Sequence, residues 1–226
     1  MVYLAKDSDF TKTWGCWVYT GSEKEVEIPE YIYGELVTST PNMFNRGYGA
    51  TEVNKVVLKH SNVTGMGSMF ASYSSSQPLD LSKLNTTNVT NMSSMFGDYS
   101  SDQPLDLSGL DTTNVTNMSG MFKGYSSDQP LDLSGLDTTN VTNMRSMFDS
   151  ANSLKEVYAR TKEDAEKLKA QATKDGISPK FYIVEKVDLD FKVALGNNKI
   201  ENVYFKDKKG KLKELKIYRE NITELQ

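Results

Sequence analysis

Residues 105–122 read LDLSGLDTTNVTNMSGMF, and nearly the same run begins again at Leu79 and at Leu131. The dipeptide Met-Phe recurs every 26 residues, at positions 43, 69, 95, 121 and 147. Self-similarity at a fixed period of this size is the signature of a repeat architecture, in which each unit buries its apolar face only by stacking on its neighbours. The sequence therefore predicts a solenoid, with three nearly identical inner units over 79–150 between two degraded end units.

Within one unit, the apolar positions alternate with polar ones. Leu105 and Leu107 flank Asp106, which predicts a short strand with its leucines pointing inward. Nine of the ten methionines lie between positions 43 and 147 at repeat positions, where flexible side chains fill an irregular core. We therefore interpret the methionines as packing residues and expect no cofactor.

The two ends of the chain depart from the repeat. We expect an N-terminal β cap over 1–42, repeats over 43–160, a capping helix and strand over 161–185, and a small C-terminal β-meander over 186–226. Thr161 followed by Asp164 predicts the start of the helix, and Gly176 its end. The expected fold is α/β leaning to mainly β, with short parallel strands and one capping helix.

The repeat resembles that of BspA-like leucine-rich repeat surface proteins, whose units commonly carry LDLSxxDTSxVTNMSxMF. The resemblance spans roughly residues 22–160. It implies a right-handed leucine-rich-repeat solenoid and attachment to host cells, matrix proteins or other surfaces. One corner departs from the family pattern: Tyr73, Tyr99 and Tyr125 each begin a Tyr-Ser-Ser run where the family usually has Cys-Ser-Ser-Leu.

A second resemblance concerns the tail. Residues 195–218, LGNNKIENVYFKDKKGKLKELKIY, are similar to repeats at the ends of phage tail and baseplate-associated proteins of Gram-positive hosts. This similarity implies a virion or prophage protein. Two functions therefore remain open. One is a non-catalytic adhesion module on a bacterial cell surface or virion; the other is a structural assembly subunit or spacer that forms homo-oligomers through residues 186–226.

Composition argues against several classes of partner. The net charge of −4 disfavours nucleic acid, because nucleic-acid-binding proteins concentrate Lys and Arg to displace counterions. The opening residues lack the apolar run of a signal peptide, and no stretch of about 18 apolar residues predicts membrane insertion. Either the protein is not exported by a cleaved signal or its sequence has been trimmed. We expect a surface, extracellular or virion location.

Catalysis is not expected. The chain has one histidine, His60, interpreted as a surface or turn residue, and one cysteine, Cys16, interpreted as a small buried apolar residue. Identical acids repeated along an array lack the differing environments that acid–base chemistry requires. We therefore predict a binder, whose partner is a host-surface protein or a cell-wall glycan.

Two ladders of equivalent residues are the candidate sites. The first is Asp80, Asp106 and Asp132 on the outward side of the strands, where the acids are solvated, bond the neighbouring serines or bind calcium. The second is a tyrosine column that either lies exposed as a ligand face or stacks inside a buried corner. The predicted ligand face comprises Tyr73, Tyr99, Tyr125, Asp102, Asp128 and Tyr158.

Overall fold

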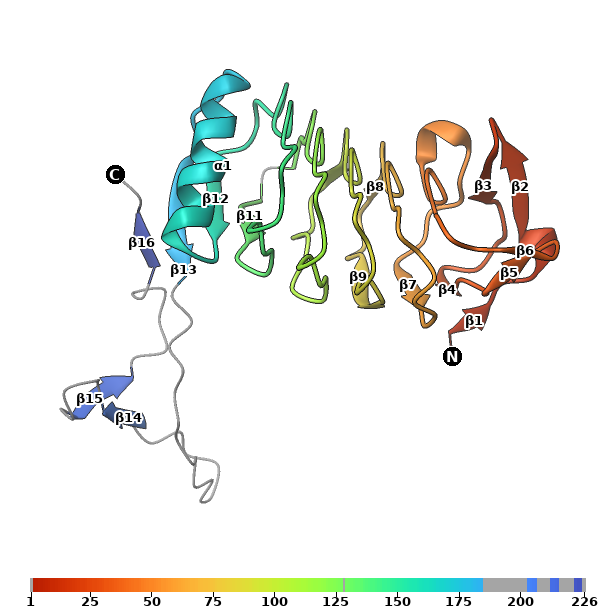
Figure 1. Ribbon diagram of the computed structural model, residues 1–226, viewed down its shortest axis with the longest axis horizontal. Coiled ribbons are helices and arrows are strands. Elements are labelled where there is room, and N and C mark those ends of the chain that lie inside the picture. The colour runs from red at the N-terminus through yellow and green to blue at the C-terminus, as the bar shows by residue number, and fades with distance from the viewer. Residues whose placement is uncertain (1, 128, 185–202, 207–211, 216–221, 225–226) are drawn as a thin grey trace.

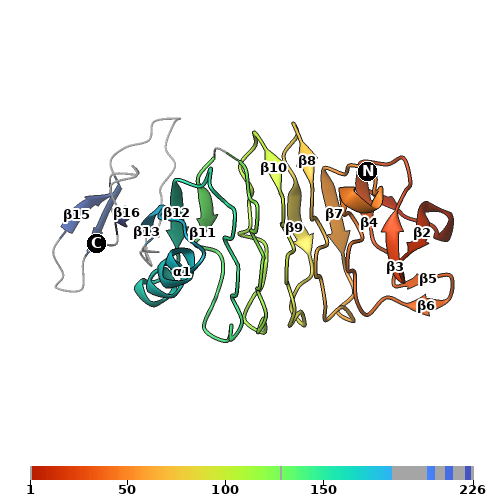
Figure 2. The same ribbon diagram turned by 90° about the horizontal axis from the view of Figure 1, so that it is seen from above.

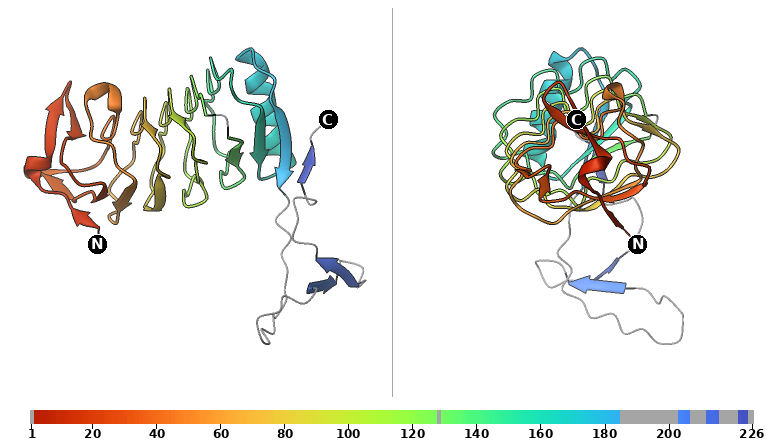
Figure 3. Two further views of the ribbon diagram at one scale, coloured as in Figure 1. Left: turned by 180° about the vertical axis from the view of Figure 1, so that it is seen from behind. Right: turned by 90° about the vertical axis from the view of Figure 1, so that its right-hand side faces the viewer.

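The computed structural model describes residues 2–127, 129–184, 203–206, 212–215 and 222–224. The described part of the chain is mainly β, with one α-helix and several parallel sheets. Successive turns of the chain stand side by side along the long axis, with hairpins at the N-terminal end and the helix at the other end (Figures 1 and 2). Seen along that axis, the turns overlie one another (Figure 3).

The 26-residue period of the sequence is also the spacing of backbone pairing. Parallel bridges join Ser39 to Gly65, Gly65 to Asn91, Asn91 to Asn117 and Asn117 to Asn143. In a second column, the Phe70 amide donates to the Met95 carbonyl and the Phe96 amide to the Met121 carbonyl, each at 2.9 Å. Equivalent residues of successive units are therefore direct neighbours.

Parallel strands cover one side of the stack. The first sheet has the order β1-β4-β7-β9, and the second has β11-β12-β13 followed by antiparallel β16. A further parallel pair joins β8 to β10 at the Tyr-Ser-Ser corner. The bounds are β1 Tyr3–Leu4, β4 Glu25–Glu27, β7 Lys55–Leu58, β8 Ser74–Ser75, β9 Asp80–Leu84, β10 Ser100–Ser101, β11 Leu131–Leu133, β12 Glu156–Ala159, β13 Lys180–Val184 and β16 Ile222–Glu224.

The prediction of a strand at Leu105–Leu107 is wrong, because these residues form no strand, although both leucines are buried as expected. The Ser108 amide donates to Asp106 Oδ1 at 2.9 Å, so this N–H is bonded within its own unit rather than across to a neighbour. The preceding Pro104 has no N–H to donate. All three inner units share these features, and in the described part of the chain the inner-unit strands on this side pair only with end-unit strands, β9 with β7 and β11 with β12.

An aromatic spine forms the centre of the core. Five phenylalanines one period apart stack face to face, with ring centroids 5.5–6.2 Å apart, and Tyr19 tilts against the first of them. The nine repeat methionines are buried around this spine, which confirms their interpretation as packing residues. The spine consists of Phe44, Phe70, Phe96, Phe122 and Phe148.

Two short antiparallel hairpins stand at the N-terminal end. One pairs β2 (Phe10–Thr13) with β3 (Cys16–Tyr19), and the other pairs β5 (Tyr31–Ile32) with β6 (Glu35–Leu36). Short 3₁₀ turns lie at Asp7–Asp9 and Arg46–Tyr48. Each hairpin has a two-residue loop, so its tip projects as a tight turn.

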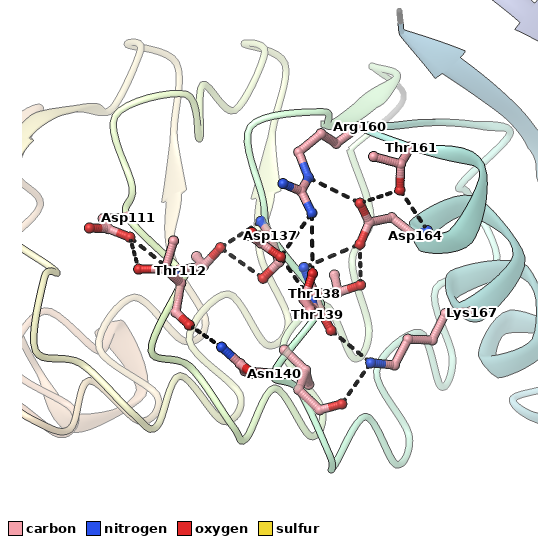
Figure 4. A network of polar contacts seen from close by, with 12 residues as sticks. Asp111, Thr112, Asp137, Thr138, Thr139, Asn140, Arg160, Thr161, Asp164 and Lys167 are labelled. Carbon is pink, nitrogen blue, oxygen red and sulfur yellow. Dashed lines mark hydrogen bonds and ion pairs between the residues drawn. The ribbon is translucent and has the colours of Figure 1, made fainter.

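Helix α1 (Lys162–Lys174) covers the other end of the stack, and Asp164 takes the place of a missing unit there. Between inner units, the Thr112 hydroxyl donates to the Asp137 carbonyl and accepts from the Asp137 amide. The last inner unit, which begins at Leu131, is not followed by another unit with an equivalent aspartate. Its Thr138 donates from both its amide and its hydroxyl to Asp164 Oδ1, at 3.2 and 2.5 Å (Figure 4).

Two more side chains from this end form hydrogen bonds with backbone groups of the last repeat. Lys167 Nζ donates to the carbonyls of Thr138 and Val141, each at 2.7 Å. The Phe148 amide, which in earlier units bonds the next turn, donates to Asp175 Oδ2 at 2.9 Å. These backbone groups of the last repeat are therefore satisfied by side chains of the helical end, as buried polar groups require.

The C-terminal segment is described in part. Strands β14 (Val203–Lys206) and β15 (Leu212–Leu215) form an antiparallel pair, and β16 pairs with β13. The remainder of the β-meander predicted over 186–226 lies outside the described residues. Within the described part of the chain, no helix has the length and apolar character needed to cross a bilayer.

Candidate functional site

The tyrosine column is buried. Tyr73, Tyr99 and Tyr125 have no exposed surface, and their rings stack with centroids 5.6 and 5.7 Å apart. Each ring also meets a spine phenylalanine edge-on, as Tyr99 meets Phe96 at 6.0 Å. Burial raises the pKa of Tyr73 to about 12, and its hydroxyl donates to the Val53 carbonyl. The ligand-face interpretation of this column was therefore wrong; the column is a buried corner.

The other predicted members of that face are dispersed. Asp102 is exposed and accepts a hydrogen bond from Gln103 Nε2 at 3.1 Å. Tyr158 is half-buried and stacks on Tyr182 at 5.2 Å in the sheet near the helix. Asp128 lies outside the described residues. The structure does not join Tyr158 and Asp102 to the tyrosine column as one surface.

The aspartate ladder is engaged within the protein. Lys55 donates to Asp80 at 2.7 Å and Ser82 donates to its second oxygen, and these bonds lower the pKa of Asp80 to about 2. Asp106 and Asp132 each accept the amide of the serine two residues later at 2.9 Å. Among the described residues, no group of three or more His, Cys, Asp or Glu side chains is placed to hold a metal ion. The arrangement corresponds to the serine-bonded alternative for this ladder.

Shallow grooves lie beside this ladder, where inner units do not pair as strands. Two of them have cavities of about 180 and 190 Å³, and both are lined by Pro104 and Asp106. The units approach closely at the groove edge. A Cβ added to Gly109 would lie 2.9 Å from Ser82 Cα, so a larger residue there would clash with the neighbouring unit. These grooves offer Asp, Ser and Pro but no aromatic side chain.

Among the described residues, four of the six exposed large apolar side chains lie instead on the two N-terminal hairpins, and the other two are Leu4 and Tyr48. Trp14 is 89% exposed, far beyond what a packing role would leave in water. On the other hairpin, the exposed fractions are 57% for Tyr33, 53% for Tyr31 and 43% for Leu36. Sequence analysis missed this surface, because it treated residues 1–42 only as a cap.

Two of these rings occupy unusual backbone positions. Trp14 and Gly15 have φ values of 51° and 82°, and Tyr33 and Gly34 have 48° and 78°. Two-residue hairpin loops with positive φ at both positions favour Asn-Gly or Asp-Gly, and a bulky side chain at the first position is strained. Strain of this kind concentrates at functional sites. The Trp-Gly and Tyr-Gly dipeptides were the signal available in the sequence.

Contacts between the hairpins build a small platform, which we call the end cluster: Lys12, Trp17, Tyr33 and Glu35. The Tyr33 ring stacks on Trp17 with centroids 5.3 Å apart and planes 20° apart. Lys12 Nζ lies 4.7 Å from the centre of the Trp17 ring and 3.0 Å from a Glu35 oxygen. The hydrogen bond from Lys12 lowers the pKa of Glu35, so this pair stays charged.

The two residues weighed for catalysis have separate surroundings. His60 is half-buried, with its Nε2 3.2 Å from the Pro29 carbonyl oxygen. Cys16 is also half-buried, with the Asn42 side-chain amide 3.8 Å from its sulfur. The expectation that Cys16 is buried was therefore wrong, because it lies next to the exposed turn of its hairpin.

Comparison with known proteins adds one match. The family described as "Mycoplasma protein of unknown function, DUF285" matches residues 38–161, which is more than half of the chain. No curated protein and no solved structure matches the chain. The matched range contains the repeats, whereas the end cluster precedes it.

Proposed function

The chain belongs to the family described as "Mycoplasma protein of unknown function, DUF285", and from that premise we propose that it is a non-catalytic binding module of a bacterial cell surface. Its ligand is a surface protein or a glycan. The repeats act as a rigid body that carries the N-terminal hairpins, and these hairpins present the ligand face. The resemblance of the repeats to BspA-like surface proteins supports this assignment.

One observation carries the proposal. Trp14 and Tyr33 are exposed at positions where asparagine would relieve backbone strain and also remove apolar surface from water. For Trp14 both changes would favour the folded protein, and for Tyr33 they would offset the loss of its stacking on Trp17. Retaining an aromatic ring at both turns is therefore best explained by a contact that the rings make with another molecule.

We further propose that the stack is a right-handed leucine-rich-repeat solenoid. Parallel bridges at exactly one period and the buried leucines of each unit support this. The alternative of an assembly subunit that oligomerises through residues 186–226 rests on a segment that lies largely outside the described residues, and no contact described here favours it.

The solenoid proposal predicts that one whole unit can be removed. Deleting residues 97–122, one full period, should leave a folded protein with one cooperative but lower thermal transition, because each unit contacts mainly its neighbours. Circular dichroism with thermal unfolding measures this. Deleting residues 110–122, half a period, places leucines opposite methionines and should abolish the transition. Equal tolerance of both deletions would contradict the proposal.

The binding proposal predicts a separation of binding from stability. In the Trp14→Asn/Tyr33→Asn double variant, both turns become Asn-Gly, and the relieved turn strain offsets the lost stacking of Tyr33 on Trp17, so the free energy of unfolding should change by less than about 1 kcal/mol. Binding of the labelled protein to cultured epithelial cells and to purified bacterial envelopes should fall at least about tenfold. Flow cytometry measures the binding, and urea denaturation measures the stability.

Tyr48→Ala is the matched control, because Tyr48 is an exposed tyrosine outside both hairpins. This variant should bind like the wild type. If the double variant binds both surfaces as strongly as the wild type, the N-terminal hairpins are not the ligand face.

A further inference from the structure

We infer that the ligand of the N-terminal hairpins is an uncharged polysaccharide, whose sugar rings lie on the exposed faces of Trp14, Tyr31 and Tyr33. This inference rests on the proposed function and specifies the ligand class. An aromatic face carries partial negative charge, and the C–H groups on one face of a pyranose ring carry partial positive charge. Exposed aromatic side chains on separate residues therefore suit a polysaccharide, which is a chain of repeated sugar rings.

The end cluster supplies the polar edge that such a ligand requires. The side chains of Lys12 and Glu35 are 46% and 59% exposed, and their ion pair lies directly beside the Trp17 ring. Lys12 has N–H donors and Glu35 has acceptor oxygens, so the pair can bond neighbouring sugar hydroxyls. Since the Tyr33 ring is already stacked on Trp17, its orientation is set before the ligand binds.

Charge excludes the acidic polysaccharides. Residues 1–42 contain three lysines and seven acidic residues, a net charge of 3 − 7 = −4. Asp7 lies within this surface, where one of its oxygens accepts the Tyr33 amide at 2.9 Å. A polyanion such as a phosphate- or uronate-rich polymer would be repelled by this end of the stack.

The form of the surface favours a sugar chain over a protein. A protein interface needs roughly 800 Å² of contiguous surface on each partner, with an apolar centre. Here the exposed rings stand on two hairpins, with Trp14 and Tyr33 at the turns and Tyr31 in β5, and exposed polar side chains on the same hairpins include Thr11 and Glu35. A chain of sugar rings can meet such spaced rings one at a time.

Affinity electrophoresis of the full chain tests the inference. Native gels contain hydroxyethylcellulose, galactomannan or a mixed-linkage β-glucan as neutral probes, or polygalacturonate as an acidic probe. The wild type should be retarded by at least one neutral polymer and not by polygalacturonate. The Trp14→Asn/Tyr33→Asn double variant should need at least about ten times more polymer for the same retardation, whereas Tyr48→Ala should match the wild type.

Three results would overturn the inference: no retardation by any neutral polymer, retardation by polygalacturonate alone, or a double variant retarded as strongly as the wild type. The relieved turn strain offsets the lost Tyr33–Trp17 stacking, and urea denaturation checks that the double variant is folded, so a lost retardation reports the rings rather than unfolding. If neutral polymers fail but the double variant still loses binding to cells, the glycan inference falls and the binding function stands. If the wild type binds neither, both fall.

Discussion

The Phe96→Ala variant is expected to lose about 4 kcal/mol of its free energy of unfolding. Phe96 is completely buried, and its ring stacks on Phe70 at 5.8 Å and on Phe122 at 5.9 Å. Tyr99 meets it edge-on. The backbone that carries each neighbouring ring is bonded to the next unit, Phe70 to Met95 and Phe122 to Met147, so the surrounding core should not move in to fill the cavity.

Urea denaturation followed by tryptophan fluorescence and circular dichroism measures this loss. Phe96→Leu is the matched control and should lose only about 1 kcal/mol, because most of the volume is retained. Because Phe96 lies in the middle of the array, the damage should divide the stack and broaden the transition. A loss in Phe96→Ala no larger than that in Phe96→Leu would show that the spine is not the main source of stability.

The Asp164→Ala variant is expected to lose about 3 kcal/mol. Asp164 is almost completely buried and accepts from Thr138, Thr161 and Arg160. Alanine would leave the Thr138 amide and the charged Arg160 without this partner, and it would expose the end of the last unit. Chemical denaturation measures the loss, and Glu166→Ala, an exposed position on the same helix, should change stability by less than about 0.5 kcal/mol.

The same carboxylate predicts a pH dependence. Burial acts to raise the pKa of Asp164, but the hydrogen bonds from Thr138, Thr161 and Arg160 outweigh it, so the pKa lies below its ordinary value of 3.8. The unfolded state then binds its proton first as pH falls. The stability from this group is complete above the ordinary pKa and is lost as pH falls through the lower, folded pKa.

Asp164→Asn isolates this contribution. The stability difference between the wild type and Asp164→Asn should be largest near neutral pH and should shrink below about pH 4. Glu166→Gln serves as the control, with a small difference at every pH. A difference that stays constant down to pH 2 would show that the charge of Asp164 contributes nothing to the cap.

Much of the repeat could be predicted from residue pattern. The leucines at 105 and 107 and the methionines are buried as their spacing implies, and the helix begins after Thr161 as the capping residues imply. The absence of a strand at 105–107 could not be predicted in the same way. The neighbours of this segment on both sides carry the same proline and the same Asp–Ser bond, and whether two such units pair depends on how closely they stand in space.

The sequence by itself determined the period, the residues of each unit that face inward and the position of the closing helix, because these follow from local spacing repeated many times. Only the tertiary structure decided which side of the Tyr-Ser-Ser corner faces water, since a tyrosine ring suits a core or a surface equally well until its neighbours are placed. It also decided that Trp14 and Tyr33 project outward, because their exposure follows from the turn geometry of two hairpins that meet through Trp17 and Lys12.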